Sequence, residues 1–540
     1  MAGLVAFPVI GLVALPLCAL VVFALDVEAG IWPHLIATVL GGYARTTTLL
    51  AAGVGVGVAA VGVGAAWLVA IHEFPLRRQF EWALMLPLAA PSYIVAFVYT
   101  DFLDYTGPVQ SGLRALFGWR NALDYDFPAI RTLPGAIVVL VLVLYPYVYL
   151  LARTAFLAQS RATLDAARML GHGHGAAFRR VALPMARPAI VVGVALALME
   201  TLNEYGTVDF FAVTVFSTGI YHVWLNMHSI EGAAGLALML VGAVAGLLWL
   251  ERRARADRRF ADPRQARGVT PRVRLTGIRA WLAMLGCALP VILGFVLPFG
   301  LLVWMSWRRM GGLFTGDLGP ALLNSLQLSA AAAGVVCLLA LSLGFANRTG
   351  RSRLLQGSSR VASVGYAIPG SVLAVGVLAP LAAFDNAVDG LMRDWFGVSS
   401  GLLLSGSLFA LLFGCSARFI AVGHGAIEAG FERIPRSHDD AARLLGCRPL
   451  ALIPRLHWPA LQSSVLTAAL LVFVDTMKEL PMTLALQPFN FRTLATISHQ
   501  YASDERFEQA APAALAIVIA GVIPVILLSR TIRTTARTGG

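Results

Sequence analysis

The sequence has little charge and little cysteine. Of its 540 residues, 13% are charged and 58% are hydrophobic, and the mean hydropathy is +0.75. Soluble domains carry about 25% charged residues, so this deficit excludes an ordinary water-soluble globular protein. The five cysteines form no Cys-x-x-Cys pair and no histidine stands at zinc spacing from them, which argues against a disulfide framework and a structural zinc. The composition is typical of a protein that crosses the membrane several times.

Lysine is almost absent as well. The only lysine is Lys478, which follows Met477 inside an apolar stretch, whereas a phosphate-binding loop needs a lysine directly after a glycine. The chain is therefore not predicted to hydrolyse ATP. No His/Asp/Ser or metal-ligand constellation stands near a predicted membrane surface. We expect a protein that is not an enzyme, with no catalytic residue, no bound cofactor and no resident metal.

The sequence has many apolar stretches that are long enough to cross a membrane. About 20 residues of helix cross ~30 Å of hydrocarbon, and twelve stretches reach that length. Ten of them contain no Asp, Glu, Lys or Arg: 1–25, 46–71, 82–100, 132–152, 232–250, 280–307, 318–347, 361–384, 395–417 and 510–529. The other two, 188–210 and 456–480, carry acids near their ends.

The basic residues lie between these stretches rather than in one patch. The net charge of +12 therefore reports membrane topology and does not indicate nucleic-acid binding. If the N-terminus is cytoplasmic, 31 of the 41 Lys and Arg residues fall in segments that face inward. The positive-inside rule then predicts that both termini lie in the cytoplasm.

One phrase occurs twice in the chain. Asp-Ala-Ala-Arg-Met-Leu-Gly runs from Asp165 to Gly171, and Asp-Ala-Ala-Arg-Leu-Leu-Gly starts at Asp440, at an offset of 275 residues. Each phrase is followed by a proline thirteen residues after its glycine, Pro184 in one case and Pro459 in the other. Nine of the twenty positions are identical, where chance gives roughly two. The chain is therefore an internal repeat.

The repeat predicts two tandem six-span units. The first covers 1–255 and the second covers 276–540, with a cytoplasmic linker at 256–275. Because each unit has an even number of spans, both have the same orientation in the membrane. The repeated loops, 161–188 and 436–463, fall between the fourth and fifth spans of their units, on the cytoplasmic side.

Each repeated loop reads as helix, glycine, helix. Residues 161–170 and 436–445 predict short amphipathic helices, and Gly171 and Gly446 stand where a helix ends in the left-handed conformation that glycine tolerates. The Ala-Ala pair allows close approach of another protein, while the Asp and Arg side chains offer charge-assisted hydrogen bonds. This pattern favours docking into a cleft of a partner protein.

The repeated loop resembles the EAA loop of permease subunits of ATP-binding-cassette (ABC) importers. Two copies in one chain resemble the fused permeases in which one polypeptide replaces a permease dimer. In both copies, Asp stands where that family usually has Glu. The positions that the resemblance marks for ATPase coupling are Asp165, Ala166, Ala167, Arg168, Gly171, Pro184, Asp440, Ala441, Ala442, Arg443, Gly446 and Pro459.

The resemblance implies an all-α integral membrane protein of about 12 transmembrane helices in two tandem permease units. It also implies two cytoplasmic ABC ATPase subunits, which use ATP and Mg, and a periplasmic or extracellular substrate-binding protein. The expected location is the bacterial inner membrane, in contact with lipid and without nucleic acid.

Four acids repeat near the ends of the fifth spans: Glu200, Glu204, Asp475 and Glu479. Spacing of four predicts that each pair shares one face of a continuous helix, in the outer half of the membrane. A carboxylate that faces lipid costs several kcal/mol, so we expect these acids to line a substrate path or to pair with a cation. Lys478 and Arg492 are candidate partners in the second copy. Structural ion pairs are the alternative.

The segments 200–211, 478–483 and 489–496 resemble the fused permeases of bacterial ferric-iron importers. A hard trivalent cation prefers oxygen ligands, which carboxylates supply. Permeases for thiamine and for phosphonates share the architecture and stay open as alternatives. An ion-gradient-driven secondary transporter is the alternative of another class, although it does not explain the repeated loop.

Overall fold

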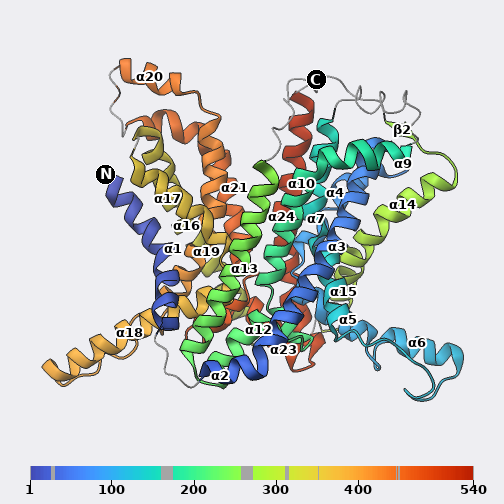
Figure 1. Cartoon of the computed structure of the whole chain (residues 1–540), viewed down its shortest axis with the longest axis horizontal. Helices are drawn as coiled ribbons and strands as arrows, with labels where there is room; N and C mark the ends of the chain where they lie inside the picture. Colours follow the sequence, from blue (N-terminus) through green and yellow to red (C-terminus); the bar gives the residue numbers. More distant parts are fainter. Residues whose placement is uncertain are drawn as a thin grey trace. The chain divides into compact units, whose positions relative to one another are not determined.

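The computed structural model describes residues 2–25, 31–159, 174–256, 272–309, 316–350, 352–445, 447 and 451–538. In these ranges the chain is almost wholly helical (Figure 1). The one sheet found there joins β1 (His72–Glu73) and β2 (Val273–Arg274) as parallel two-residue strands.

Eleven helices of the described ranges are long and apolar enough to cross a membrane, and a bent helix pair makes a twelfth span. The predicted all-α membrane architecture with about 12 spans is confirmed.

The helices of the first half follow the chain from α1 to α13. They are α1 (Ala2–Leu25), α2 (Ile31–Leu35), α3 (Gly41–Ile71), α4 (Arg77–Ala83), α5 (Ser92–Leu103), α6 (Pro108–Phe117), α7 (Leu133–Ala158), α9 (His174–Ala177), α10 (Leu183–Asn203), α11 (Gly206–Phe210), α12 (Phe216–Tyr221) and α13 (Ile230–Ala256).

The helices of the second half follow the chain from α14 to α24. Its helices are α14 (Ile278–Val291), α15 (Leu297–Arg308), α16 (Leu318–Thr349), α17 (Arg353–Val364), α18 (Gly370–Phe396), α19 (Leu408–Glu432), α20 (Arg436–Leu444), α21 (Trp458–Met477), α22 (Pro481–Leu486), α23 (Leu494–Ser503) and α24 (Phe507–Thr538).

Two compact units form, and each draws on both halves of the sequence. One consists of Met1–Leu40, Phe216–Val241 and Gly311–Tyr501, and the other of Gly41–Val215, Gly242–Met310 and Ala502–Gly540. The first span of each half thus packs among helices of the other half: α1 contacts α16, α17 and α18, whereas α14 contacts α3 and α15 contacts α5. The domain boundaries predicted at 255 and 276 describe the sequence repeat and stay a prediction.

Glycines allow the closest of these contacts. A Cβ atom added at Gly376 of α18 would lie 2.7 Å from the carbonyl oxygen of Pro16 in α1. One added at Gly62 of α3 would lie 2.9 Å from the carbonyl oxygen of Tyr145 in α7. A larger residue at either position would push two helix backbones apart, so small residues set how closely these helices pack.

The third span of the first half, predicted as the stretch 82–100, is bent and is not one continuous helix. The helical segments on either side of residues 90 and 91 meet at 91°. The 3-10 helix η2 (Leu86–Ala89) ends there, and α5 begins directly after Pro91. Pro87 and Pro91 have no backbone N–H to donate, so a regular helix does not continue through this stretch.

Two predicted spans of the second half are shifted. The stretch 361–384 is divided between α17 and α18, because the chain breaks before Pro369. The stretch 395–417 begins too early, since α19 starts at Leu408 and continues past Arg418. The Arg418 side chain is buried against an acid, so its charge does not end the span.

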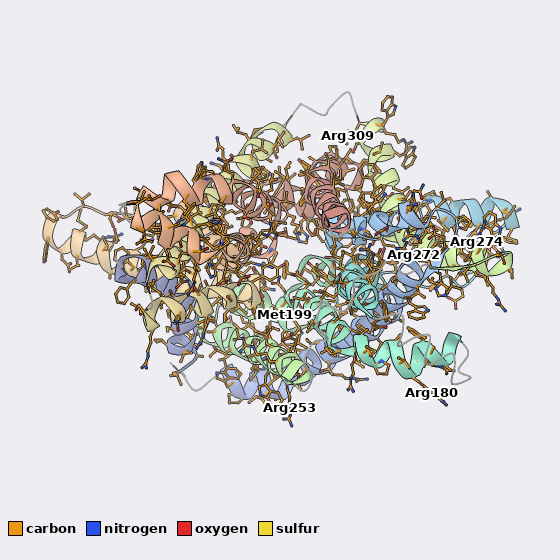
Figure 2. The ribbon with its side chains drawn as sticks, turned by 90° about the horizontal axis from the view of Figure 1, so that it is seen from above. Arg180, Met199, Arg253, Arg272, Arg274 and Arg309 are labelled. Atoms are coloured by element: carbon orange, nitrogen blue, oxygen red, sulfur yellow. The ribbon has the colours of Figure 1, made fainter. Side chains whose placement is uncertain are left out.

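The connections at one end of the molecule carry several arginines. Figure 2 views the molecule from the end that carries α9 and β2, and labels Arg180 of the π-helix η3 (Phe178–Ala182), Arg253 of α13 and Arg274 of β2. These segments belong to connections that the charge distribution predicts to be cytoplasmic.

Candidate functional site

Both fifth spans break at the second acid of each repeated pair. In the first half, Glu204 Oε1 accepts a hydrogen bond of 2.8 Å from the backbone N–H of Thr207. In the second half, Glu479 Oε1 accepts one of 3.2 Å from the N–H of Met482. Each glutamate thus satisfies a free donor at the start of the short helix that follows, α11 or α22, as a capping side chain does.

The prediction that each acid pair shares one face of a continuous helix is therefore wrong. α10 ends at Asn203, and Glu204 is extended with φ −67° and ψ 126°. α21 ends at Met477, two residues before Glu479. The physical reason is local: Pro481 has no N–H to donate in the second half, and in both halves the glutamate carboxylate replaces a helix carbonyl as acceptor.

In the first half, the acid at the break is bonded to a second helix break. Ser92 Oγ donates a 2.5 Å hydrogen bond to Glu204 Oε2. Ser92 is the first residue of α5 and directly follows Pro91 at the bend of the third span. Glu204 therefore joins the breaks of the third and fifth spans within one compact unit.

In the second half, the equivalent acid forms a buried ion pair. Arg418 Nη1 of α19 lies 2.6 Å from Glu479 Oε2, and the two side chains are only 6% and 5% exposed. Removing one partner of such a pair leaves an uncompensated charge and costs about 3–5 kcal/mol. Val143 occupies the position of Arg418 in the first half, at the repeat offset of 275 residues.

A glycine makes room for this ion pair. Gly370 follows Pro369 in the second half, as Ser92 follows Pro91 in the first. A Cβ atom added at Gly370 would lie 2.6 Å from Arg418 Nη1 and 2.8 Å from Glu479 Oε1. The glycine and the arginine are therefore spatially linked, and the two halves hold equivalent acids by different chemistry.

The first acids of the pairs lie in the last turns of α10 and α21. Lys478 Nζ pairs with Asp475 Oδ1 at 2.8 Å, so one predicted cation is a partner of these acids. The other, Arg492, lies 2.9 Å from Asp317 instead. Glu200 is half-buried at the end of α10. The role of all four acids in a substrate path stays a prediction.

The second repeated loop contains the predicted short helix as α20. At its end, the N–H of Cys447 donates a 3.0 Å hydrogen bond to the carbonyl of Ala442. This six-residue closure is the bond of a Schellman motif. Gly446 itself and the side chain of Arg443 lie outside the described residues, as do residues 160–173 of the first loop with Asp165, Ala166, Ala167, Arg168 and Gly171.

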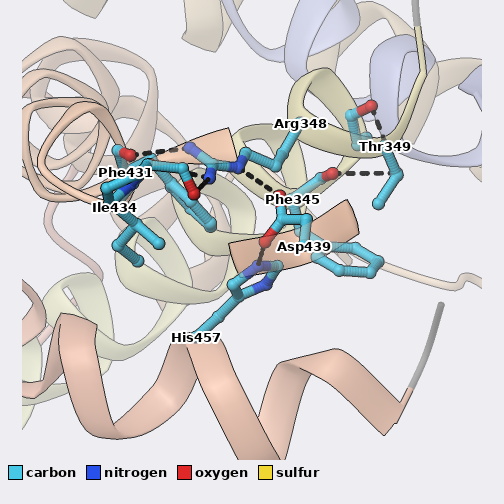
Figure 3. Close-up of polar contacts among 9 residues, drawn as sticks. Phe345, Arg348, Thr349, Phe431, Ile434, Asp439 and His457 are labelled. Atoms are coloured by element: carbon cyan, nitrogen blue, oxygen red, sulfur yellow. Dashed lines mark hydrogen bonds and ion pairs between the residues drawn. The ribbon is translucent and has the colours of Figure 1, made fainter. Parts of the chain in front are cut away.

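The structure adds Asp439 to this loop, a residue that the sequence prediction missed. Figure 3 shows its buried carboxylate between two basic side chains. Arg348 Nε, at the end of α16, lies 2.6 Å from Oδ2, and His457 Nε2, in the π-helix η10 (Ile453–His457) before α21, lies 2.9 Å from Oδ1. The adjacent Asp440 is exposed.

Arg348 also bonds to the backbone that leads into α20. Its Nη1 donates to the carbonyl of Phe431 at 2.8 Å, and its Nη2 donates to the carbonyls of Ile434 at 2.7 Å and Pro435 at 3.1 Å. Burial alone raises the pKa of Asp439, but hydrogen bonds and charges from Arg348 and His457 outweigh it and hold the pKa below its usual range. α20 is thus fixed to α16, α19 and α21.

Comparison with known proteins identifies the family. The family model of the binding-protein-dependent transport system inner membrane component matches residues 61–259 and 338–534. Each matched range contains one repeated loop and one broken fifth span. The chain belongs to this family. It is therefore a permease of an ABC importer, and the predicted resemblance to fused permeases is confirmed by two matched domains in one chain.

Individual relatives differ in coverage. The Fe(3+)-transport system permease protein FbpB 2 of Haemophilus influenzae is 24% identical over 495 residues, which is 90% of this chain and 88% of the relative. The sulfate transport system permease protein CysW of Escherichia coli is 31% identical over 27% of this chain and 48% of its own length. The molybdenum transport system permease protein ModB of Escherichia coli is 26% identical over 37% of this chain and 87% of its own length.

Family membership settles the class of this permease. It is a multi-pass inner-membrane protein of a transport system, and its family is a family of permeases and not of enzymes. The family implies an ATPase and a substrate-binding protein as partners. It decides against the ion-gradient-driven transporter that the sequence left open.

Proposed function

We propose that this permease forms the membrane path for ferric iron released by an external binding protein. The supporting observation is the ferric-iron relative, because it matches nearly the whole chain, including both halves. The sulfate and molybdenum relatives match 27% and 37% of it. Carboxylates at the helix breaks also suit a hard cation better than an oxyanion.

In this proposal the breaks of the fifth spans belong to the path. Glu204 and Glu479 sit where the helix stops, so a small displacement of α11 or α22 moves a carboxylate. Glu200 and Asp475 supply further oxygens one turn earlier. Glu479 and Asp475 are paired with Arg418 and Lys478, so they would join the path only when these ion pairs open. Glu200 and Glu204, by contrast, would supply the anionic oxygens that favour a passing cation.

Energy would come from two partner ABC ATPases that use ATP and Mg²⁺, while this chain binds neither. They would dock on the loops around Asp165 and Asp440, and both chain termini would lie on the same cytoplasmic side. The exposed Asp440 and Ala441 of α20 are available for docking. The bonds of Asp439 and Arg348 would transmit the movement of α20 to α16 and α21.

Reconstitution tests the substrate. Proteoliposomes that contain the permease and its ATPase are supplied in turn with binding proteins loaded with Fe³⁺, thiamine, a phosphonate or molybdate. We expect ATP hydrolysis and uptake to rise with the ferric form. A rise with thiamine or phosphonate instead would replace iron as the substrate and leave the permease assignment intact.

A substitution tests the path. Glu204→Gln keeps side-chain size and a hydrogen-bond acceptor for Ser92, so we expect normal assembly but iron uptake reduced about tenfold, equivalent to ~1.4 kcal/mol. Ser363→Ala, on the exposed surface of α17, is the matched control and should leave uptake unchanged. Normal uptake by the Glu204→Gln permease would remove Glu204 from the path.

A further inference from the structure

Each half of the chain has an amphipathic helical segment that extends away from the long helices of its unit. We call them the outer arms: residues 104–131, with α6, and residues 384–405, with the end of α18. Figure 1 shows both helices running away from the long helices of their units, at the end opposite to α9 in one unit and to α20 in the other. Both arms connect a third span to a fourth span.

The two arms end in similar sequences, which share Arg, Phe and Gly at the same spacing. Arg114-Ala-Leu-Phe-Gly118 closes α6, and Arg393-Asp-Trp-Phe-Gly397 closes α18. Both glycines have positive φ, 72° and 66°, and end their helices in the left-handed conformation. The repeat of this ending indicates that the arms are equivalent elements of the two halves.

An uncovered apolar stripe runs along each arm. In α6, Val109, Leu113 and Leu116 follow the spacing i, i+4, i+7; Val109 and Leu113 are half-buried, and Leu116 is 76% exposed. Phe117 beside them is 60% exposed. This spacing places the apolar side chains on one face of the helix.

The second arm has the same stripe in a longer form. Phe384, Val388, Leu391 and Trp395 follow the spacing i, i+4, i+7, i+11 along the end of α18. Leu391 is 53% exposed and Trp395 is 75% exposed. Val388 is half-buried, whereas Phe384, Leu391 and Trp395 are exposed, and a soluble surface rarely leaves several large apolar side chains of one helix face exposed.

The polar face of the first arm is covered by the arm's own returning loop. Arg114 Nη1 donates a 2.9 Å hydrogen bond to Tyr125 Oη, and Tyr125 Oη donates a 2.6 Å bond to Gln110 Oε1. Trp119 stacks between Phe117 and Tyr125, with ring centroids 4.8 and 4.7 Å away. The loop therefore covers the polar side, contacts Phe117 through Trp119 and leaves Leu116 exposed.

The second arm is built in the same way with different residues. Asp385 accepts hydrogen bonds from the backbone N–H groups of Leu404 and Ser405, at 3.0 and 2.8 Å. Asp389 accepts from the Ser399 hydroxyl at 2.6 Å and from the Ser400 N–H at 2.8 Å. Again the returning loop satisfies the polar side of the helix.

We propose that both outer arms are interfacial anchors, whose apolar stripes lie at the boundary of headgroups and hydrocarbon in the outer leaflet. The α18 arm continues without a break from a membrane-spanning helix, and α6 follows α5 after four residues, so both arms begin where a membrane-spanning segment ends. Leucine next to Trp and Phe is the composition of helices that lie in this boundary. Because the returning loops cover the polar faces of the arms, the lipid boundary covers their exposed apolar side chains.

Site-directed spin labelling tests the anchors in nanodiscs of phosphatidylethanolamine and phosphatidylglycerol. The five native cysteines are replaced, and single labels are placed at Leu116→Cys and Leu391→Cys on the stripes. Ala115→Cys and Asp394→Cys, both exposed and on other faces, are the matched controls. Collision with oxygen reports lipid, and collision with a soluble nickel chelate reports water.

We expect the two stripe labels to collide preferentially with oxygen and the two controls with nickel. Equal nickel accessibility at all four positions would overturn the proposal. Shielding of positions 116 and 391 that arises only after a binding protein is added would also overturn it, because the stripes would then be protein-docking surfaces. All four positions are exposed, so the labelled chains should assemble normally, which size-exclusion chromatography of the nanodiscs checks.

Discussion

Equivalent acids of the two halves have partners of different charge. Glu204 and Glu479 occupy the same position in the repeat, and both cap the short helix after the break. Glu204 meets the neutral hydroxyl of Ser92, whereas Glu479 meets the guanidinium of Arg418. The pseudo-symmetry of the sequence therefore does not extend to the electrostatics of the two breaks.

This difference predicts unequal effects of one conservative change. Glu479→Gln leaves Arg418 buried without its ion-pair partner, and we expect a loss of about 3–5 kcal/mol in the free energy of unfolding. Glu204→Gln keeps an acceptor for Ser92 and should cost about 1 kcal/mol. Thermal unfolding of both variants in the same nanodiscs measures the difference. Equal melting temperatures would contradict the role of the ion pair.

Asp439 provides a second prediction at the scale of a residue. Asp439→Asn removes the charge that holds Arg348 and His457, so amide hydrogen exchange in α20 should become at least about tenfold faster, or ~1.4 kcal/mol of local opening. Asp440→Asn, on the exposed side of the same helix, is the control and should leave exchange in α20 unchanged. Equal protection in both variants would show that the buried contacts do not hold α20.

The lowered pKa of Asp439 gives the attachment of α20 a pH dependence. Because the folded pKa lies below the unfolded value of about 4, the stabilisation is fully present above pH ~4 and is lost as the pH falls through the folded value. Exchange in α20, corrected for the intrinsic effect of pH, should therefore rise at acidic pH. Asp439→Asn should remove this part of the dependence; an unchanged profile in that variant would assign it to another group.

The sequence could not reveal the role of Asp439. Its partners, Arg348 and His457, lie 91 and 18 residues away in the sequence. A comparison of the two halves does not reveal the contact either, because Leu164 and Ala182 occupy the first-half positions of Asp439 and His457. The repeated phrase points to Asp440 alone. The adjacent pair of aspartates was the available signal, since two neighbouring helix residues point in different directions and one of them can face the bundle.

Among elements, the spans whose interior is apolar throughout were predictable, and the broken ones were not. α3, α7 and α16 fall within a few residues of the predicted stretches, because helix length and apolar composition decide such cases. The prediction placed span ends at charges, so it misplaced α19, which contains the paired Arg418. It also ran through the breaks at Pro91 and Pro369, although proline was a visible signal.

The end of α20 carries a prediction about the coupling loop. The bond between Cys447 and Ala442 has the spacing of a Schellman closure, and the sequence places Gly446 at the position that is left-handed in this motif, which stays a prediction. Gly446→Val should weaken binding of the ATPase more than it lowers the melting temperature, since a β-branched residue disfavours positive φ. Gly446→Asn tolerates that conformation and is the control. Co-purification with the ATPase measures both, and full binding by the Gly446→Val chain would contradict a coupling role.

On the scale of the whole molecule, the charge distribution and the exchanged spans make separate predictions. The first concerns topology: reporter tags at residues 1 and 540 should both be cytoplasmic, because most basic residues lie in segments on that side. Accessibility of either tag in intact cells would contradict the topology. A tag in the loop 104–131 should be accessible from outside and serves as the control.

The second concerns the two halves of the chain. Each compact unit takes a first span from the other half, so residues 1–255 and 276–540 expressed together as two chains should purify as one complex. Either half expressed alone should be unstable, because its own first span lacks the helices that it packs against. Two halves that are each stable and do not associate would show that the exchange is unimportant for folding.

The exchange of first spans also imposes an order on biosynthesis. One compact unit includes residues up to Tyr501 and the other includes α24, so neither can close until the ribosome has made these parts of the second half. At about 5–20 residues per second, α1 waits for at least roughly 15 seconds in the bilayer before α16 to α18 emerge to receive it. Its glycine-matched contact at Pro16 stays open during that time. Lipid or an insertion factor would therefore have to keep α1 apart from wrong partners until α16 to α18 have been made.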